Sequence, residues 1–546
     1  MAQFSLHAYD ADVWVPQFMG LNQADDGMNQ DIRFASEEKN VETVGGVLQP
    51  RAPYTILNHN SDPFAGAPIE TLTWFYRRWF TGEGSKGWFV AASGGHLYAS
   101  QTGVSDEWLQ ITMPQDLESF QSNVWSWVTY EINPEGAEHS IDVLIMTNPL
   151  DGMIMISPPD RPYAWSSVAT HNWGYYSTKT WGELMSNEWV IEQIEIAPLD
   201  EDEEEDIKFG ILTRSNERIW GGAIPGHPDR LIYSAPYNPT DWTQNNEHPE
   251  DGAGEILQPS WDGDSFTALR QFGDQLLAFK QHRVWRVLGT NPGEYTFKEQ
   301  YGGGTGYPNT IAVDIEKVFM VDNDGPSVFD GMSVSPYARE QIRHLWQTVN
   351  KSALDQMCAA LYQQRYYLAL PVDGSTVNNA LLIYNMREGT ILFHKDIYIE
   401  SLLSTSDGLF ATSSTIPGKV MKLGYDSWQE GQASGAATRW VSPWIDFGYK
   451  RIQKGGFDLY ITPEVQKDPV TIKFSIQTEK KTKTKEYTVT PLTAAQIAAN
   501  KEYRYKKLHF GGTGRKFRII IETEEGSTAP WRLVGGLHLV VETDPD

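Results

Sequence analysis

Short strands separated by tight turns fill residues 209–301, and this pattern constrains the fold more than any other feature of the chain. Within FTALRQFGDQLLAFKQHRVWRVLG, a turn at Gly273-Asp274 precedes the strand Leu276–Lys280, and a second turn precedes the strand Val284–Leu288. Evenly spaced short strands with turn residues between them are typical of a β-propeller, in which small sheets surround a common axis. The sequence therefore predicts an all-β fold with a propeller at its centre.

Comparable units of short strands recur on both sides of this stretch. Four strands in about forty residues form one blade of a propeller. We expect blades at 70–112, 120–157, 308–336, 358–396 and 398–426, with two more inside 209–301. The sequence thus predicts a β-propeller of about seven blades across residues 51–428. Residues 1–50 are interpreted as an N-terminal arm that leads into the first blade, and residues at about 158–206 as an insertion.

The aromatic residues of the central stretch are interpreted as core rather than as a ligand site. Large rings at strand ends fill the space between neighbouring sheets. The six expected to pack between blades are Trp220, Tyr233, Trp242, Phe272, Phe279 and Trp285.

The C-terminal part has a different organisation. Gln429–Ala437 is rich in small residues and is interpreted as a linker. The strands expected after it, in residues 438–546, predict a separate β-sandwich.

Several segments resemble a known family. The runs RLIYSAPYNPTDW, ALRQFGDQLLAFKQHRVWRVLG and GGGTGYPNTIAVDIEKVFMVDNDGPSVFDG, within about 207–335, resemble the propeller-bearing tail proteins of tailed bacteriophages. That group includes the tail nozzle and packaged-DNA stabilisation proteins of short-tailed phages. SPWIDFG, GRKFRIIIET and WRLVGGLHLVVE are similar to the C-terminal modules of such proteins.

The resemblance implies a structural virion protein, a tail nozzle or tail-tip component. It would form an oligomeric ring, with a hexamer favoured, around the DNA channel, and would retain packaged DNA and release it on infection. The implied partners are adaptor or portal-side proteins, tail fibres and double-stranded DNA bound without sequence specificity. The protein would reside in the virion and assemble in the host cytoplasm. The alternative is a carbohydrate-binding or carbohydrate-cleaving propeller protein that acts on the host surface.

The net charge of −27 is unevenly distributed. Residues 438–546 hold 18 Lys+Arg and 13 Asp+Glu, a net of +5, so residues 1–437 carry −32. An acidic body does not grip nucleic acid by neutralising its phosphates. Three explanations stay open: the charge maintains solubility, it lines a duct through which DNA slides, or it complements charges on neighbouring subunits.

No set of residues with catalytic, cofactor or metal chemistry stands out. Gly302–Thr305 lacks the lysine of a phosphate-binding P-loop. Asp322-Asn323-Asp324-Gly325 begins like a calcium loop without the later bidentate glutamate, and a hairpin turn is the simpler interpretation. The single Cys358 excludes a cysteine-rich zinc site and a disulfide framework. We therefore expect no enzyme activity, no cofactor and no metal.

Two charged runs are candidates for partner contact. The acidic run consists of Asp200, Glu201, Asp202, Glu203, Glu204, Glu205 and Asp206, and the basic run of Lys480, Lys481, Lys483 and Lys485. The acidic run is interpreted as a solvated loop, with calcium capture or a basic partner as alternatives. The basic run is interpreted as a solvated hairpin tip, with an acidic neighbour or DNA as alternatives.

The chain carries no expected membrane span or signal peptide. No run of 18 apolar residues occurs, and the first residues, MAQFSLHAYDADVW, lack a basic segment followed by an apolar one.

Overall fold

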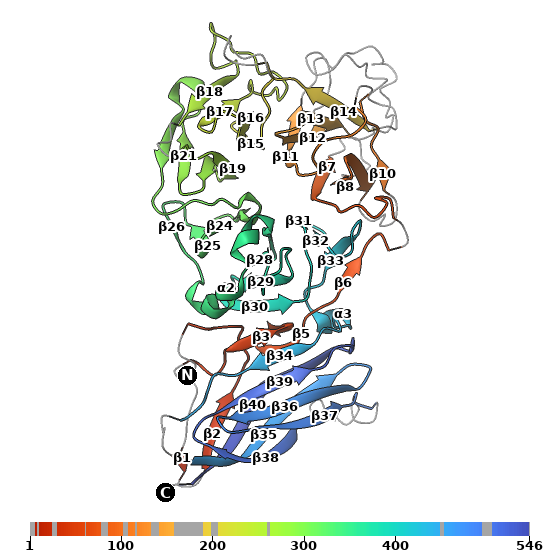
Figure 1. Ribbon diagram of the computed structural model, residues 1–546, viewed down its shortest axis with the longest axis vertical. Coiled ribbons are helices and arrows are strands. Elements are labelled where there is room, and N and C mark those ends of the chain that lie inside the picture. Colours follow the sequence, from red (N-terminus) through yellow and green to blue (C-terminus); the bar gives the residue numbers. More distant parts are fainter. Residues whose placement is uncertain are drawn as a thin grey trace.

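A computed structural model confirms that the fold is all-β, with forty strands and only short helices among the described residues (Figure 1). The structure describes residues 6–7, 10–24, 30–59, 62–77, 86–101, 108–114, 117–132, 141–157, 189–197, 206–258, 263–447, 453–493 and 505–544. The helices are η2 (Pro292–Glu294), η3 (Pro308–Thr310), η4 (Glu340–Ile342), α2 (Arg343–Thr348), η5 (Lys351–Gln356) and α3 (Ser427–Glu430).

Within these residues, seven antiparallel sheets have four strands each. The first three are β7 (Thr71–Arg77), β8 (Lys86–Ser93), β9 (His96–Gln101), β10 (Leu109–Gln110); β11 (Ser126–Ile132), β12 (Ile141–Asn148), β13 (Gly152–Ser157), β14 (Val190–Ile194); and β15 (Ile211–Ser215), β16 (Arg218–Gly222), β17 (Arg230–Tyr233), β18 (Gly254–Leu257). The next two are β19 (Phe266–Phe272), β20 (Gln275–Lys280), β21 (Val284–Leu288), β22 (Thr296–Glu299); and β23 (Ala312–Val313), β24 (Val318–Asp322), β25 (Gly325–Phe329), β26 (Val334–Pro336). The last two are β27 (Cys358–Tyr362), β28 (Arg365–Leu370), β29 (Ala380–Asn385), β30 (Thr390–Lys395); and β31 (Leu402–Thr405), β32 (Gly408–Thr412), β33 (Val420–Leu423), β6 (Tyr54–Ile56).

The seven sheets form a ring (Figure 1). The first-named strand of each sheet contacts the first-named strand of the next, and β31 of the last sheet contacts β7 of the first. The last sheet is completed by the N-terminal strand β6, which pairs with β33 through Met421↔Ile56 and Leu423↔Tyr54. This pairing joins the beginning of the ring to its end and covers a sheet edge.

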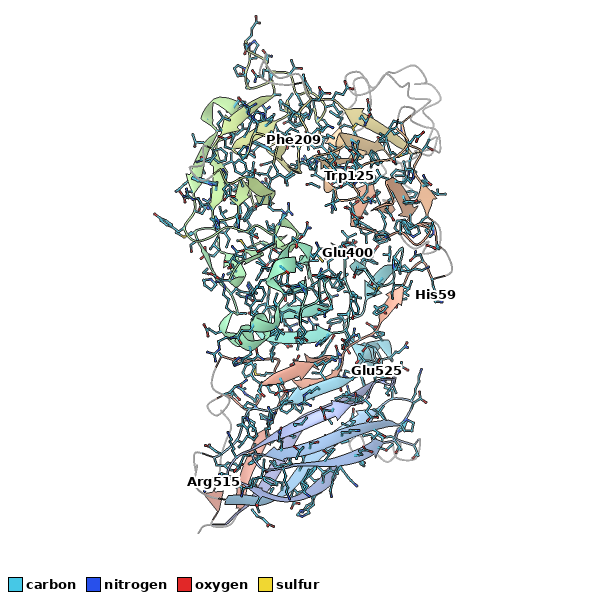
Figure 2. All side chains as sticks on the ribbon, viewed as in Figure 1. His59, Trp125, Phe209, Glu400, Arg515 and Glu525 are labelled. Atoms are coloured by element: carbon cyan, nitrogen blue, oxygen red, sulfur yellow. The ribbon has the colours of Figure 1, made fainter. Side chains whose placement is uncertain are left out.

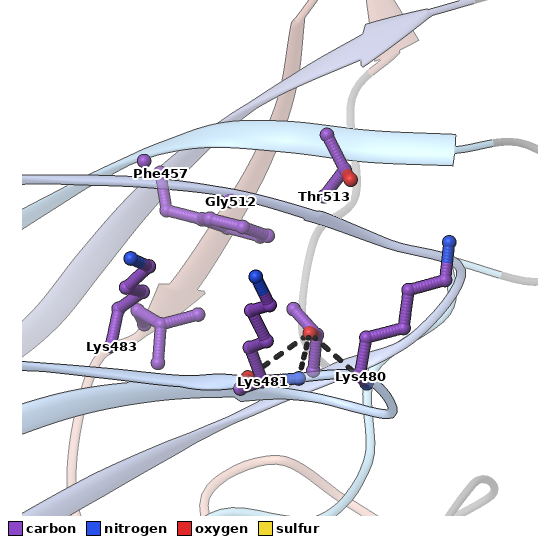
Figure 3. A pocket seen from close by; sticks show the side chains of 9 residues that line it. Phe457, Lys480, Lys481, Lys483, Gly512 and Thr513 are labelled. Carbon is purple, nitrogen blue, oxygen red and sulfur yellow. Dashed lines mark hydrogen bonds between the residues drawn. The ribbon is translucent and has the colours of Figure 1, made fainter.

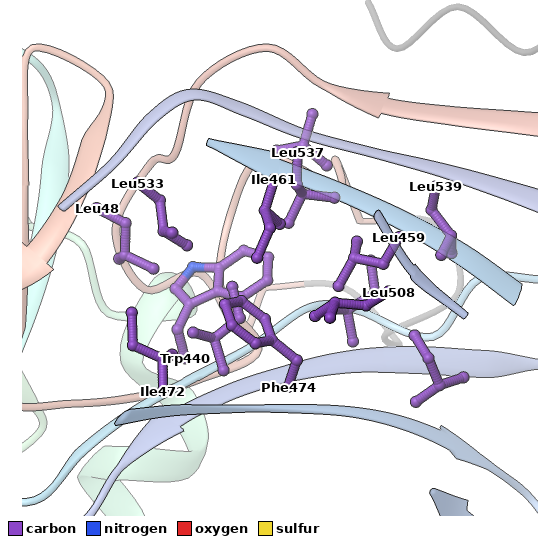
Figure 4. Close-up of a cluster of buried hydrophobic side chains, with 14 of the residues drawn as sticks. Leu48, Trp440, Leu459, Ile461, Ile472, Phe474, Leu508, Leu533, Leu537 and Leu539 are labelled. Atoms are coloured by element: carbon purple, nitrogen blue, oxygen red, sulfur yellow. The ribbon is translucent and has the colours of Figure 1, made fainter. Parts of the chain in front are cut away.

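Two larger sheets form a second body next to the ring (Figure 1). One contains β1 (Leu6–His7), β2 (Asp10–Val15), β4 (Val41–Val44), β5 (Val47–Pro50), β35 (Gln453–Val465), β38 (Lys506–Gly514) and β40 (Trp531–Asp544). The other contains β3 (Glu37–Lys39), β34 (Thr438–Val441), β36 (Val470–Thr478), β37 (Thr482–Val489) and β39 (Phe517–Thr523). We call this part the two-sheet body. Apolar side chains of both sheets meet in its core, including Trp440, Leu459 and Phe474 (Figure 4).

The N-terminal residues belong to this body, which differs from the expected arm and independent C-terminal module. Strand β2 pairs with β40 from Asp10↔Glu542 to Val15↔Leu537. Val13 and Val15 are 1% and 0% exposed and join the same core as Leu539. Residues 438–546 alone would therefore leave one side of β40 unpaired and part of the core open to water.

The linker and the insertion also differ from expectation. Ala433 is buried, and its N–H donates to the Thr528 carbonyl at 2.8 Å, so this part of Gln429–Ala437 is packed against the two-sheet body. In the expected insertion, residues 158–188 and 198–205 lie outside the described residues. Between them, β14 pairs with β13 and completes the second sheet of the ring, so the insertion does not extend over all of 158–206.

The predicted aromatic core is confirmed. Five of its rings are at most 8% exposed, and the sixth, Phe272, packs partly buried against the same clusters. Trp220 on β16 lies 4.8 Å from Tyr233 of its own sheet and 5.0 Å from Tyr295, which directly precedes β22 of the next sheet, measured between ring centroids. Buried apolar clusters join each pair of neighbouring sheets in the ring, whose described side chains are drawn in Figure 2.

Substitution of Trp220 by Ala should destabilise the ring. The indole is 1% exposed and spans two sheets, so its removal leaves a cavity that costs about 3–5 kcal/mol. Thermal unfolding followed by circular dichroism measures the loss. Leu257→Ala is the control, because that side chain is 51% exposed and should change stability little. Equal melting temperatures for Trp220→Ala and the parent would contradict the assignment.

The two-sheet body should need the N-terminal strands in order to fold. Residues 438–546 alone are expected to give a poorly dispersed amide NMR spectrum, because β40 lacks β2 and the core lacks Val13 and Val15. Residues 10–50 joined to this fragment through a flexible linker should restore dispersion. A well-dispersed spectrum from residues 438–546 alone would show that the C-terminal part is independent after all.

Candidate functional site

The basic run lies on a hairpin at the edge of the two-sheet body. The hairpin turns between β36 and β37, where the Thr478 N–H donates to the Lys481 carbonyl at 2.8 Å. On β37, Lys483 pairs with Ile476 and Lys485 with Phe474. Directly paired residues share one face of a sheet. Because Ile476 and Phe474 are core residues, both lysines lie on the face that points toward the other sheet.

A cavity of about 470 Å³ opens between this hairpin and β38 (Figure 3). The described residues that line it are Phe457, Ile476, Thr478, Lys480, Lys481, Lys483, Gly511, Gly512 and Thr513, a set with three lysines and no carboxylate. In Figure 3 the three lysine side chains rise from the hairpin toward β38. Lys485 stands apart, with its Nζ 5.9 Å from the centroid of the Phe510 ring. We call this opening the lysine seam.

One end of the lysine seam is held by Glu479. Its carboxylate accepts hydrogen bonds from the backbone N–H groups of Arg515 at 2.7 Å and Lys516 at 3.2 Å. These bonds tie the turn of the basic hairpin to the turn between β38 and β39. Arg515 marks the end of the two-sheet body that lies away from the ring (Figure 2).

The acidic run is placed only in part. Asp200, Glu201, Asp202, Glu203, Glu204 and Glu205 lie outside the described residues, and Asp206 is exposed. The structure therefore brings three of the candidate lysines together and does not test the role of the acidic residues.

A cluster of ionisable groups is buried where the two-sheet body meets the ring. Glu42 on β4 is 1% exposed, and its carboxylate lies 3.9 Å from Nη1 of Arg365 on β28 and 3.8 Å from Nε2 of His394 on β30. Beside it, the Glu38 carboxylate accepts the backbone N–H of Phe393 at 3.3 Å. We call this group of residues the buried junction.

Asn40 secures the backbones at the buried junction. Its side-chain oxygen accepts the N–H of Lys395 at 2.9 Å, and its side-chain nitrogen donates to the Ala437 carbonyl at 2.9 Å. Its own N–H donates to the Phe393 carbonyl at 3.0 Å. The loop around Asn40 thus lies along the outer edge of β30 and connects that strand to Ala437, directly before β34.

Burial controls ionisation at the buried junction. Desolvation raises the pKa of Glu42 to about 8, although the Arg365 guanidinium acts to lower it. Burial raises the pKa of Glu38 well above its ordinary value and lowers the pKa of His394 well below its own. The imidazole of His394 is therefore held neutral, and Glu42 holds a proton to a higher pH than an exposed glutamate does.

Sequence patterns did not reveal either group of partners. The glycines opposite the lysines, Gly511 and Gly512, follow the basic run by almost thirty positions, and only the sheet pairing brings them together. Glu42 is the one charged residue of strand β4 and Arg365 the one charged residue of β28. A charged residue inside a buried strand indicates a buried polar contact, but the sequence does not show which residue is its partner.

Potential metal ligands gather at one described place. His248, Glu250 and Asp251 offer ligand atoms within 4.8 Å of one another, and all three are exposed. The calcium-like run at Asp322 forms the hairpin turn between β24 and β25, where the Asp322 carboxylate pairs with Arg339 at 2.5 Å. The ion pair with Arg339 accounts for Asp322 as a structural residue of this turn.

The chain matches no protein-family model and no curated protein sequence. Among solved structures, it is similar to the Pan2 WD40 domain of Neurospora crassa, with a TM-score of 0.33 and 9% sequence identity. The similarity covers 68% of this chain and 94% of that one. Across the described residues, no helix has the length and apolar character needed to cross a bilayer.

Replacing Glu42 with Gln should remove a pH dependence of stability. The unfolded chain releases the Glu42 proton near pH 4.5, and the folded chain keeps it up to about pH 8. The stability it contributes is therefore full below pH 4.5 and lost as the pH rises through 8. Between pH 7 and 8 the parent should lose about 1 kcal/mol relative to Glu42→Gln, because folded Glu42 is about half deprotonated by pH 8.

Denaturant unfolding at several pH values measures this difference. The series starts at pH 7 because His394, with its lowered pKa, produces the opposite slope below its ordinary value of 6.5. Glu388→Gln is the matched control, since Glu388 is exposed at the turn between β29 and β30. Parallel pH profiles of stability for the parent and Glu42→Gln would show that the pKa of Glu42 is not raised in the folded protein.

Proposed function

We propose that the seven sheets of the ring are the blades of a β-propeller and that the two-sheet body is a β-sandwich. The unbroken succession of contacting inner strands, closed by β31 against β7, supports the first part. The single apolar core between the two larger sheets supports the second. The sandwich would then be built from both ends of the chain.

We further propose that this chain is a structural component of a bacteriophage tail, a nozzle or tail-tip protein, and not an enzyme. The stretch that resembles such proteins, about 207–335, supplies the third, fourth and fifth sheets of the ring. The buried junction supports a structural role for the chain, because it joins the ring and the two-sheet body through buried side chains and backbone hydrogen bonds. A subunit whose two parts are joined by such buried contacts can hold a fixed geometry in an assembly.

Exposed apolar side chains on the ring suit contacts with other subunits. Tyr301 and Met332 are 84% and 77% exposed. They lie on neighbouring segments, because the Val334 N–H donates to the Tyr301 carbonyl at 2.7 Å. Exposed aromatic and methionine side chains that lie together are enriched at protein interfaces. In this proposal they contact a further copy in an oligomeric ring, with six copies favoured, or a tail adaptor or fibre.

The acidic body would act as a duct for DNA. Residues 1–437 carry a formal net charge of −32, so carboxylates that face the channel repel the phosphates of the duplex. DNA could then be retained by loops that block its path and leave quickly once they move. Such a protein would reside in the virion and assemble in the host cytoplasm.

The isolated protein should bind duplex DNA weakly or not at all at physiological salt. Repulsion by the acidic body acts at short range there, since the Debye length is about 8 Å. Fluorescence anisotropy with a labelled duplex measures the affinity. Tight binding with a steep dependence on salt would contradict the duct, because it would mean that several phosphates are neutralised.

A second measurement separates the structural role from its rival. Electron microscopy of the protein mixed with other tail components should show rings or tail-like assemblies. Cleavage of a polysaccharide by the purified chain would instead favour a carbohydrate-active protein.

A further inference from the structure

We propose that the lysine seam binds an extended, carboxylate-rich segment of a partner protein. The segment would lie between β37 and β38, with its main chain along the strand edges and its acidic side chains toward Lys480, Lys481 and Lys483.

The seam lies between two strand edges that have no sheet partner among the described residues. Strand β37 pairs with β36, and β38 pairs with β35, each on one side only. The two strands contact each other without forming a ladder. Edge strands carry N–H and C=O groups that can pair with an added strand, and many proteins bind extended peptides in this way.

The positions of the lysines favour an anionic occupant. The outward face of β37 already has partners, since Thr484 bonds with Ser475 at 2.8 Å and Glu486 lies 3.4 Å from Lys473. Lys483 lies on the opposite face, where its paired neighbour Ile476 is 1% exposed. Three ammonium groups around a cavity whose described lining holds no carboxylate create a positive potential that an acidic chain would neutralise.

The shape of the seam favours a polypeptide over a nucleic acid. Its floor is apolar, formed by Phe457 and Ile476, and its volume of about 470 Å³ lies within the range of ligand clefts. Gly511 and Gly512 leave the β38 side open, and a Cβ added to Gly511 would meet nothing within 4 Å. A peptide can use the apolar floor and both kinds of backbone group, whereas phosphates can only accept hydrogen bonds.

Inward-pointing lysines also have a simpler use, because charges on an edge strand prevent sheets from joining edge to edge. That use requires neither an open cavity nor glycines opposite the lysines. It predicts self-association when the charge is removed, whereas a binding site predicts loss of ligand, so one set of variants separates the two.

The test uses the full chain and a fluorescent peptide in which Glu and Thr alternate, so that an extended conformation places every Glu on one face. A peptide with Gln in place of Glu, and a DNA duplex, serve as comparison probes. Lys483→Gln should weaken binding of the acidic peptide by about fivefold or more, because one charge-assisted contact is lost. Gly511→Leu should weaken it as well by filling the β38 side without changing the charge.

The matched control is Lys467→Gln, which removes the same charge from an exposed position in the turn between β35 and β36. It should leave peptide binding unchanged. Circular dichroism and sedimentation of each variant establish that it is folded and report its oligomeric state.

Three results would overturn the proposal. The acidic peptide could fail to bind, or bind all variants equally. The DNA duplex could bind and lose affinity in Lys483→Gln while the peptide does not bind, which would assign the seam to nucleic acid. Lys483→Gln could self-associate without any peptide binding by the parent, which would assign the lysines to edge protection. The seam would bind an acidic segment whether or not the chain serves in a phage tail.

Discussion

The pairing of the first long strand with the last one is the constraint on which both parts of the molecule depend. β2 lies along β40 for six residue pairs, and the chain then contributes β3, β4 and β5 before β6 completes the last sheet of the ring. The N-terminal segment therefore closes two structures in succession. A displaced β2 would leave β40 with an open edge and would loosen the segment that leads to β6. The closure of the ring and the core of the two-sheet body are in this way physically connected.

The buried junction fixes how the ring and the two-sheet body meet, and its burial costs desolvation free energy. Glu42, Arg365 and His394 lose their water, and their mutual contacts at 3.8–3.9 Å recover only part of the loss. An apolar contact of the same size would permit many relative positions of ring and body. Buried groups with hydrogen bonds, such as the Glu38 carboxylate that accepts the Phe393 N–H at 3.3 Å, permit fewer, because a shift would leave them without a partner. The hydrogen bonds of Asn40 to both parts have the same effect.

Local patterns predicted the strands of the ring well but not the long-range pairings. The strand expected at Val284–Leu288 has those bounds in the structure, because alternating side chains and a preceding turn act over a few residues. The partnership of Asp10–Val15 with Leu537–Glu542 leaves no such trace, since any apolar strand edge satisfies the same pattern. The sequence also did not predict the orientation of the Lys483 side chain. It follows from the register of β37 against β36, and a shift of one residue would have turned it outward.

The chain order of β2 and β40 has a consequence for synthesis in the cell. The ribosome makes β2 long before β40, so Val13 and Val15 lack their partners on β40 until residues 531–544 have emerged. Six of the seven sheets of the ring consist of neighbouring segments and can form during translation, whereas the two-sheet body can form only after β40 is made. A prematurely terminated chain would thus carry much of the ring and no completed second body. Only chains that extend through β40 would have both parts in place, which gives an assembly pathway a structural means of excluding shorter ones.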